Sequence, residues 1–237
     1  MTILVAVKRD GRVFLGADRL TAFGNEYRTD LVNGSKIIRL KHAYLATSGY
    51  GLMSDVIEHL QSANHKMMDN TFKDRIQVFS FFLELYNELK KSYTLVEPGK
   101  ETYASIYNSF LAVTPKDIYG ISTNLSVCEY EHFVAKGCGS EYAEGCLYGM
   151  YNLIDDGFEL TRLALEAACH YSVYCKEPLD IINVTASDLG HTKVKHEKLV
   201  TIKTPRGVDN LIAVTKSALQ SSAKVQRKKV KSNGKAY

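Results

Sequence analysis

The chain has 237 residues, of which 45% are hydrophobic and 24% charged, with a formal net charge of +4. This composition is ordinary for a globular protein with a buried core. No stretch approaches the roughly 18 consecutive apolar residues that span a bilayer, which excludes a transmembrane helix. The apolar run at residues 1–8 has no basic region before it and no small-residue cleavage site after it. We therefore expect no secretory signal and a cytoplasmic protein.

The positive charge is concentrated at one end of the chain. Residues 210–237 contain seven Lys or Arg and no Asp or Glu, so the remainder carries a net charge of about −3. We expect one domain over residues 1–222, followed by a basic, disordered tail at 223–237. The tail has no aromatic residue before Tyr237, so nucleic-acid binding by base stacking is not indicated. Binding of an acidic partner stays open.

The cysteines and histidines show no metal-ligand spacing. There is no C-x-x-C pair and no H-E-x-x-H, so we expect no metal site and no cofactor. The cysteine count is odd, which favours reduced thiols over a disulfide framework. The five cysteines are Cys128, Cys138, Cys146, Cys169 and Cys175.

The first third of the chain changes from strand to helix patterns. Residues 2–8 are β-branched and aliphatic, Asp10-Gly11 supplies a two-residue turn, and 12–17 returns as the hairpin partner. Two further strands are expected at 36–40 and 43–47. Beyond Gly51 apolar residues recur at intervals of three or four, which predicts helices over about 52–60 and 71–92.

The rest of the chain repeats this order after a Pro98-Gly99 break. The predicted elements are strands at 103–113, 116–122 and 127–135, helices from Ser140 to about 153 and over 160–171, strands at 179–186 and 193–202, and a last helix at 208–221. Strands and helix pairs in this order predict an α+β fold. Two antiparallel sheets would pack together between helix pairs, in a four-layer αββα sandwich.

Short motifs within these elements carry the information about chemistry. In chain order they are Thr2 to Gly11, Gly16-Ala17-Asp18, Phe23-Gly24-Asn25, Gly34 to Leu40, Thr47 to Asp55 and Gly137 to Ala143. In this order they resemble the proteasome β subunits and, more closely, HslV, the bacterial peptidase ring. The resemblance covers roughly residues 2–190. It implies a threonine peptidase of the N-terminal-nucleophile (Ntn) hydrolase class.

The resemblance implies that Thr2 is the nucleophile once Met1 has been removed. A threonine hydroxyl needs a base to take its proton, and a free α-amine with a pKa of about 7.7–8.0 is suited to that task. Lys36 would stabilise the oxygen anion of Thr2, and Asp18 would hold Lys36 charged and oriented. The backbone N–H of Gly51 would face the developing oxyanion. These are the roles that the family's matching positions have.

The chain departs from the family pattern at three positions. Cys138 stands where the family usually has serine, and its thiol is a weaker hydrogen-bonding group. Val173 and Lys176 stand where proteasome β subunits carry an aspartate and a serine that support the N-terminal threonine. Taken singly, Thr2 and Lys36 also have ordinary interpretations, as a strand residue and a surface lysine.

The implied function is a threonine endopeptidase subunit of a self-compartmentalised ring. Its partners would be identical or related subunits, polypeptide substrates and an ATP-dependent unfoldase, and no membrane is involved. Two alternatives stay open: a catalytically silent ring subunit of the same fold, and an Ntn amidase that acts on a small amide. Met53 lies near the presumed substrate pocket and points to an apolar S1 site.

Overall fold

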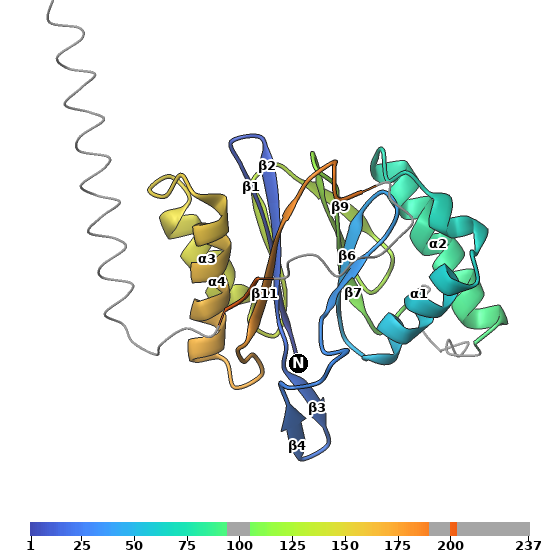
Figure 1. Ribbon diagram of the computed structural model, residues 1–237, viewed down its shortest axis with the longest axis horizontal. Coiled ribbons are helices and arrows are strands. Elements are labelled where there is room, and N and C mark those ends of the chain that lie inside the picture. The colour runs from blue at the N-terminus through green and yellow to red at the C-terminus, as the bar shows by residue number, and fades with distance from the viewer. Residues whose placement is uncertain (94–104, 190–199, 203–237) are drawn as a thin grey trace, which may run out of the picture.

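The computed structural model describes residues 1–93 and 105–189, together with the backbone of 200–202. It has four layers, with one helix pair, two sheets and a second helix pair following one another across the molecule (Figure 1). The predicted α+β sandwich of two antiparallel sheets between helix pairs is therefore confirmed. The predicted helix at 208–221 and the tail at 223–237 lie outside the described residues.

The first sheet contains the N-terminal strand. Its strands stand in the order β10 (Phe133–Gly137), β1 (Ile3–Arg9), β2 (Arg12–Asp18), β11 (Leu179–Val184) and β12 (Val200–Ile202). All pairs are antiparallel. β1 and β2 are joined at Asp10 and Gly11, whose φ angles of +49° and +72° suit the tight turn predicted there. Both faces of this sheet are covered, which explains why Ile3 to Val7 are apolar without alternation.

The second sheet stands in the order β5 (Ile37–Arg39), β6 (Tyr44–Ser48), β7 (Ser109–Val113), β8 (Ile118–Ile121) and β9 (Val127–Tyr130). The single strand predicted over 127–135 is wrong. The chain leaves the second sheet after β9 and enters the first sheet as β10, crossing at Glu131 and His132. Neither residue is a turn former, so the sequence carries no signal of the crossing.

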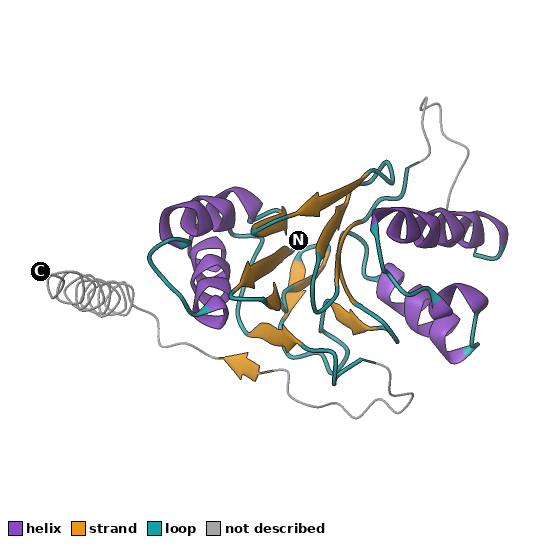
Figure 2. Cartoon of the chain, turned by 90° about the horizontal axis from the view of Figure 1, so that it is seen from above, coloured by secondary structure: helices purple, strands orange, loops and turns teal. Residues whose placement is uncertain are grey.

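The helices form the outer layers (Figure 2). On one side are α1 (Leu52–Ser62) and α2 (Arg75–Lys91), with a short 3₁₀ helix (Lys66–Asp69) between them, and on the other α3 (Ser140–Met150) and α4 (Gly157–Tyr171). Ser140 is the first helical residue of α3. None of the helices among the described residues combines the length and apolarity that crossing a membrane requires.

Three clusters of buried apolar side chains fill the spaces between the layers. One lies between α1–α2 and the second sheet, one between α3–α4 and the first sheet, and one between the two sheets. The apolar groups in each cluster are removed from water on folding, which is the main stabilising contribution to a layered fold. Thr2 and Asp18, at two strand ends, are buried polar exceptions to this pattern.

The hairpin of β3 (Thr21–Phe23) and β4 (Glu26–Arg28) was not predicted. It stands away from the sandwich, close to the N-terminus (Figure 1). Its turn contains Gly24 with a φ of +58°. Each strand has only three residues, too few for an alternating pattern to be recognised in the sequence.

Candidate functional site

Thr2 lies immediately before β1, an inner strand of the first sheet. The residue is 2% exposed, and its carbonyl oxygen accepts a hydrogen bond of 2.8 Å from the backbone N–H of Cys138. Its hydroxyl donates to the carbonyl oxygen of Met1. The backbone of Thr2 is therefore fixed by β10, while its Oγ1 is directed toward the Met1–Thr2 peptide bond.

Asp18 ends β2 and is completely buried. Its Oδ1 accepts hydrogen bonds from Lys36 Nζ at 2.6 Å and from the Ile3 N–H at 2.9 Å. Its Oδ2 accepts from the N–H groups of Leu20 and Lys176, both at 3.2 Å. A buried carboxylate is tolerable only when paired and hydrogen-bonded, and these four donors meet that requirement. Asp18 thus ties the start of β1 to Lys36.

Lys36 comes from the second sheet, just before β5, and its side chain is 12% exposed. Besides Asp18, its ammonium group contacts the Met1 carbonyl oxygen at 3.3 Å. That oxygen is also the acceptor for the Thr2 hydroxyl. The structure therefore brings Thr2, Asp18 and Lys36 together, although they are up to 34 positions apart in the sequence.

Cys138 and Gly51 occupy different surroundings. Cys138 follows β10, its backbone contacts Thr2, and the residue is exposed. Gly51 is the N-cap of α1 with an ordinary helical φ of −59°, and among the residues that the structure describes it makes no hydrogen bond to Thr2. The N–H groups at a helix start lack partners within the helix, so this position is chemically suited to an anion.

Two glycines in these motifs have conformations that favour glycine. Gly137 has a φ of +102°, and a Cβ there would lie 2.3 Å from the carbonyl oxygen of Thr2 and 3.1 Å from Ser48 Oγ. Gly49 has a φ of +142°, and a Cβ there would lie 2.6 Å from the Tyr107 carbonyl oxygen. Both positions exclude a side chain. Ser48 is thereby placed beside Thr2, which the sequence reasoning missed.

Val173 and Lys176, two of the residues that depart from the family pattern, lie in different environments. Val173 is 82% exposed. Lys176 supports Asp18 through its backbone N–H, a group that any residue except proline provides. Its ammonium group donates to the Tyr27 hydroxyl at 2.9 Å and lies 4.0 Å from the centre of the Tyr27 ring. This hydrogen bond lowers the pKa of Tyr27.

Two further cysteines lie near the cluster. Burial, together with the negative charge of Asp18, raises the pKa of the Cys175 thiol to about 11. Burial and the same charge also raise the pKa of Cys169. Both thiols stay protonated near neutral pH, and a thiol is a far weaker nucleophile than a thiolate. In the part of the chain that the structure describes, no three His, Cys, Asp or Glu side chains gather as metal ligands.

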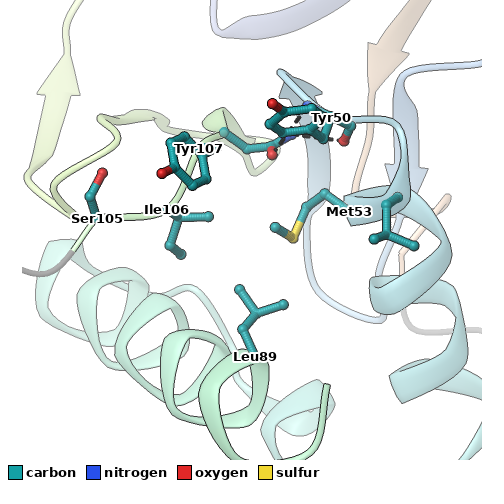
Figure 3. A pocket seen from close by; sticks show the side chains of 8 residues that line it. Tyr50, Met53, Leu89, Ser105, Ile106 and Tyr107 are labelled. Carbon is teal, nitrogen blue, oxygen red and sulfur yellow. Dashed lines mark hydrogen bonds between the residues drawn. The ribbon is translucent and has the colours of Figure 1, made fainter. Parts of the chain in front are cut away.

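Met53 lines an apolar pocket of about 270 Å³ between α1, α2 and the segment before β7 (Figure 3). Its other lining residues are Tyr50, Leu52, Leu89, Ser105, Ile106, Tyr107 and Asn108. None of Thr2, Asp18, Lys36 and Cys138 belongs to this lining. The position of Met53 therefore does not support its assignment to a substrate pocket beside Thr2.

Comparison with known proteins agrees with the geometry. Residues 2–183 match the family model described as proteasome subunit. BPH from Thiobacillus denitrificans is similar in structure, with 25% identity, a TM-score of 0.70, and coverage of 78% of this chain and all of that one. BPH in complex with epoxomicin gives a TM-score of 0.69 at the same identity and coverage.

HslV from Trypanosoma brucei shares the fold, with 17% identity, a TM-score of 0.57, and coverage of 77% of this chain and 98% of that one. Curated protein sequences gave no match. The matched range covers more than half of the sequence and includes Thr2, Asp18 and Lys36. The chain belongs to the proteasome subunit family.

Proposed function

We propose that this chain is a threonine endopeptidase whose nucleophile is the hydroxyl of Thr2. The observation that carries the proposal is the convergence of Thr2 Oγ1 and Lys36 Nζ on one oxygen, the Met1 carbonyl, with Asp18 behind the lysine. A hydroxyl beside a fixed, partly buried cation is a group whose anion is stabilised. Nothing in this arrangement needs a cofactor.

The reaction requires cleavage of the Met1–Thr2 peptide bond. As long as this bond is intact, the Thr2 nitrogen is an amide and has no proton-accepting capacity. After cleavage it is an α-amine, whose ordinary pKa of about 7.7–8.0 suits a general base near neutral pH. Met1 is partly exposed, so the bond is near the surface.

The proposed steps then follow from the positions of these groups. The amine takes the hydroxyl proton, and Oγ1 attacks the carbonyl carbon of a peptide bond. Lys36 stabilises the developing negative charge, and an amide of the turn that precedes α1 receives the oxyanion. The protonated amine gives its proton to the leaving amine. Water then hydrolyses the ester on Thr2 and regenerates the hydroxyl.

We further propose that copies of the chain, or related subunits, assemble into a ring in the cytoplasm, in which the threonines face an enclosed chamber. Folded substrates would then need an ATP-dependent unfoldase. The support is the family membership and the likeness in fold to HslV. Sedimentation and electron-microscopy class averages of the purified full-length protein test the ring, and a monomer at micromolar concentration would contradict it.

The peptidase proposal is tested by intact mass spectrometry with epoxomicin, because the similar BPH structure was solved in complex with that compound. We expect the wild-type chain to lose Met1 and to gain one epoxomicin, and Thr2→Ala to gain none. Thr21→Ala, in the β3–β4 hairpin, is the matched control and should react like the wild type. Absence of both the adduct and peptide hydrolysis would instead assign the chain as a silent subunit.

A further inference from the structure

Asn108 is a buried amide that no sequence motif pointed to. It lies directly before β7 and is 1% exposed. Its Nδ2 donates to Thr47 Oγ1 at 2.9 Å and to the Tyr50 carbonyl oxygen at 3.1 Å. Its Oδ1 accepts from the Tyr50 N–H at 3.3 Å. Because the Tyr50 carbonyl oxygen can only accept, the amide nitrogen must face it, which fixes the orientation of the side chain.

These three hydrogen bonds enclose Gly49, which follows the end of β6. A Cβ at position 49 would lie 2.7 Å from both Cγ and Nδ2 of Asn108. The amide plane of Asn108 thus packs against the backbone of Gly49, while its polar atoms bind the residues on either side. One side chain therefore determines the path of the chain from β6 into α1, a path that includes a φ of +142°.

The turn of residues 48–51 that Asn108 holds is adjacent to Thr2. A Cβ built on Gly137 would lie 3.1 Å from Ser48 Oγ and 2.3 Å from the Thr2 carbonyl oxygen. Because both atoms are near the same position, Ser48 and Thr2 lie close to each other. Ser48 therefore borders the reaction centre, whereas Tyr50 faces the apolar pocket on the other side (Figure 3). The turn forms the boundary between the two.

The backbone N–H groups of this turn differ in whether another protein group accepts their hydrogen bond. The Tyr50 N–H is occupied by Asn108. Among contacts between described residues, the N–H groups of Gly49 and Gly51 make no hydrogen bond to another protein group. An oxyanion binds to donors that are held in place and that no other acceptor occupies. The turn has two such donors, and Asn108 withdraws the one between them.

We propose that Asn108 is a positioning residue for catalysis, which holds the turn of residues 48–51 so that its unoccupied amides receive the oxyanion formed at Thr2. This inference rests on the proposed peptidase function. It goes beyond that function because Asn108 touches neither Thr2 nor Lys36 and acts only through the turn.

The test uses two variants of the full-length protein and one control. Asn108→Asp keeps the shape and the acceptor for the Tyr50 N–H, but a carboxylate donates nothing to Thr47 or to the Tyr50 carbonyl oxygen. Thr47→Val is the milder variant, because it removes only one of the three partners. Asn124→Asp makes the same chemical change at an exposed turn between β8 and β9.

Two readouts separate positioning from folding. A peptide vinyl sulfone reacts with the Thr2 hydroxyl without forming a carbonyl-derived oxyanion, so its labelling counts competent sites and measures nucleophile reactivity. Peptide hydrolysis, expressed per labelled site, additionally needs the oxyanion donors. A partly unfolded variant has fewer labelled sites but unchanged kcat per site.

We expect Asn108→Asp to lower kcat per labelled site by about 10- to 100-fold. This decrease should not exceed the decrease in kcat that removal of an oxyanion donor causes. KM and the rate of vinyl sulfone labelling should stay within about threefold. Thr47→Val should show a smaller loss of the same kind, and Asn124→Asp none. An unchanged kcat, or equal losses of kcat and labelling rate, would overturn the role of Asn108 alone. If the wild type takes up no probe, the peptidase proposal fails as well.

Discussion

The two sides of the turn at residues 48–51 differ in what they bury. On the side of Thr2, the buried groups are polar, and Asp18 alone accepts four hydrogen bonds. On the side of Met53, the pocket is lined mainly by apolar side chains. Buried polar groups are costly unless each is satisfied, whereas apolar ones stabilise wherever they pack. We therefore expect substitutions on the Thr2 side to affect hydrolysis, and substitutions on the Met53 side to affect only stability.

The sharpest test of this contrast removes the charge of Lys36. Lys36→Met leaves the buried carboxylate of Asp18 without its cation, so we expect a loss of about 3–5 kcal/mol in unfolding free energy. We also expect hydrolysis to fall by roughly 10²–10⁴-fold. Urea unfolding and steady-state kinetics measure the two effects.

The double variant Lys36→Met with Asp18→Asn provides the control for that experiment. It removes both charges, so part of the lost stability should return while hydrolysis stays low. The return is partial because the Asn amide nitrogen replaces an oxygen that accepts at least one backbone N–H. If hydrolysis recovers together with stability, the lysine has only a structural role, and the contrast between the two sides disappears.

A second prediction concerns the contact between Gly137 and Thr2. Gly137→Ala would place a methyl group 2.3 Å from the Thr2 carbonyl oxygen, so the start of β1 must move. We expect hydrolysis to fall by about 100-fold, because small displacements of reacting groups cost that much. Gly11 also has a positive φ, but an added Cβ there would meet no atom of another segment within 4 Å. Gly11→Ala should therefore cost only about 1–2 kcal/mol of unfolding free energy. Equal activity in both variants would contradict the proposed geometry.

On the other side of the turn, Met53→Ala should affect stability without affecting chemistry. Met53 is buried, so its truncation should cost about 2–5 kcal/mol of unfolding free energy. Hydrolysis per labelled site should change by less than about threefold. A selective loss of cleavage after large apolar residues would show that Met53 contacts the substrate, and would contradict a purely structural role for this side of the turn.

The substitution of Cys138 has the smallest expected effect on hydrolysis. Its residue is exposed beside Thr2, so iodoacetamide at pH 8 should modify it and block access to the threonine. Cys175, with a pKa raised to about 11, should stay unmodified because it is protonated at that pH. Cys138→Ser should keep hydrolysis within about threefold and make it insensitive to the reagent. Peptide mapping by mass spectrometry identifies the modified thiols.

The proximity of three residues of the candidate site could be predicted because the family motifs are local. Thr2, Asp18 and Lys36 each stand in a recognisable segment, and the structure brings these segments together. Their catalytic roles stay a prediction. The alternation of strand and helix patterns likewise gave the layers, because the patterns with periods of 2 and about 3.6 residues are strong over long elements.

What could not be predicted depends on contacts between distant segments. Asn108 binds Thr47, 61 positions away, and an isolated asparagine before a strand gives no sign of such a partner. Two glycines of the motif around Gly51 look equivalent in the sequence, yet only Gly49 has a positive φ. Local patterns specify elements, whereas these features arise only after the two sheets have packed.

The central claim is that the Thr2 nitrogen becomes a free amine beside Lys36. The most direct measurement is the tandem mass spectrum of the N-terminal peptide from the purified, assembled protein. We expect a peptide that begins with Thr2 and carries a free α-amine. A protein that hydrolyses peptides while every chain still begins with Met1 would contradict the claim, because an amide nitrogen cannot take the hydroxyl proton.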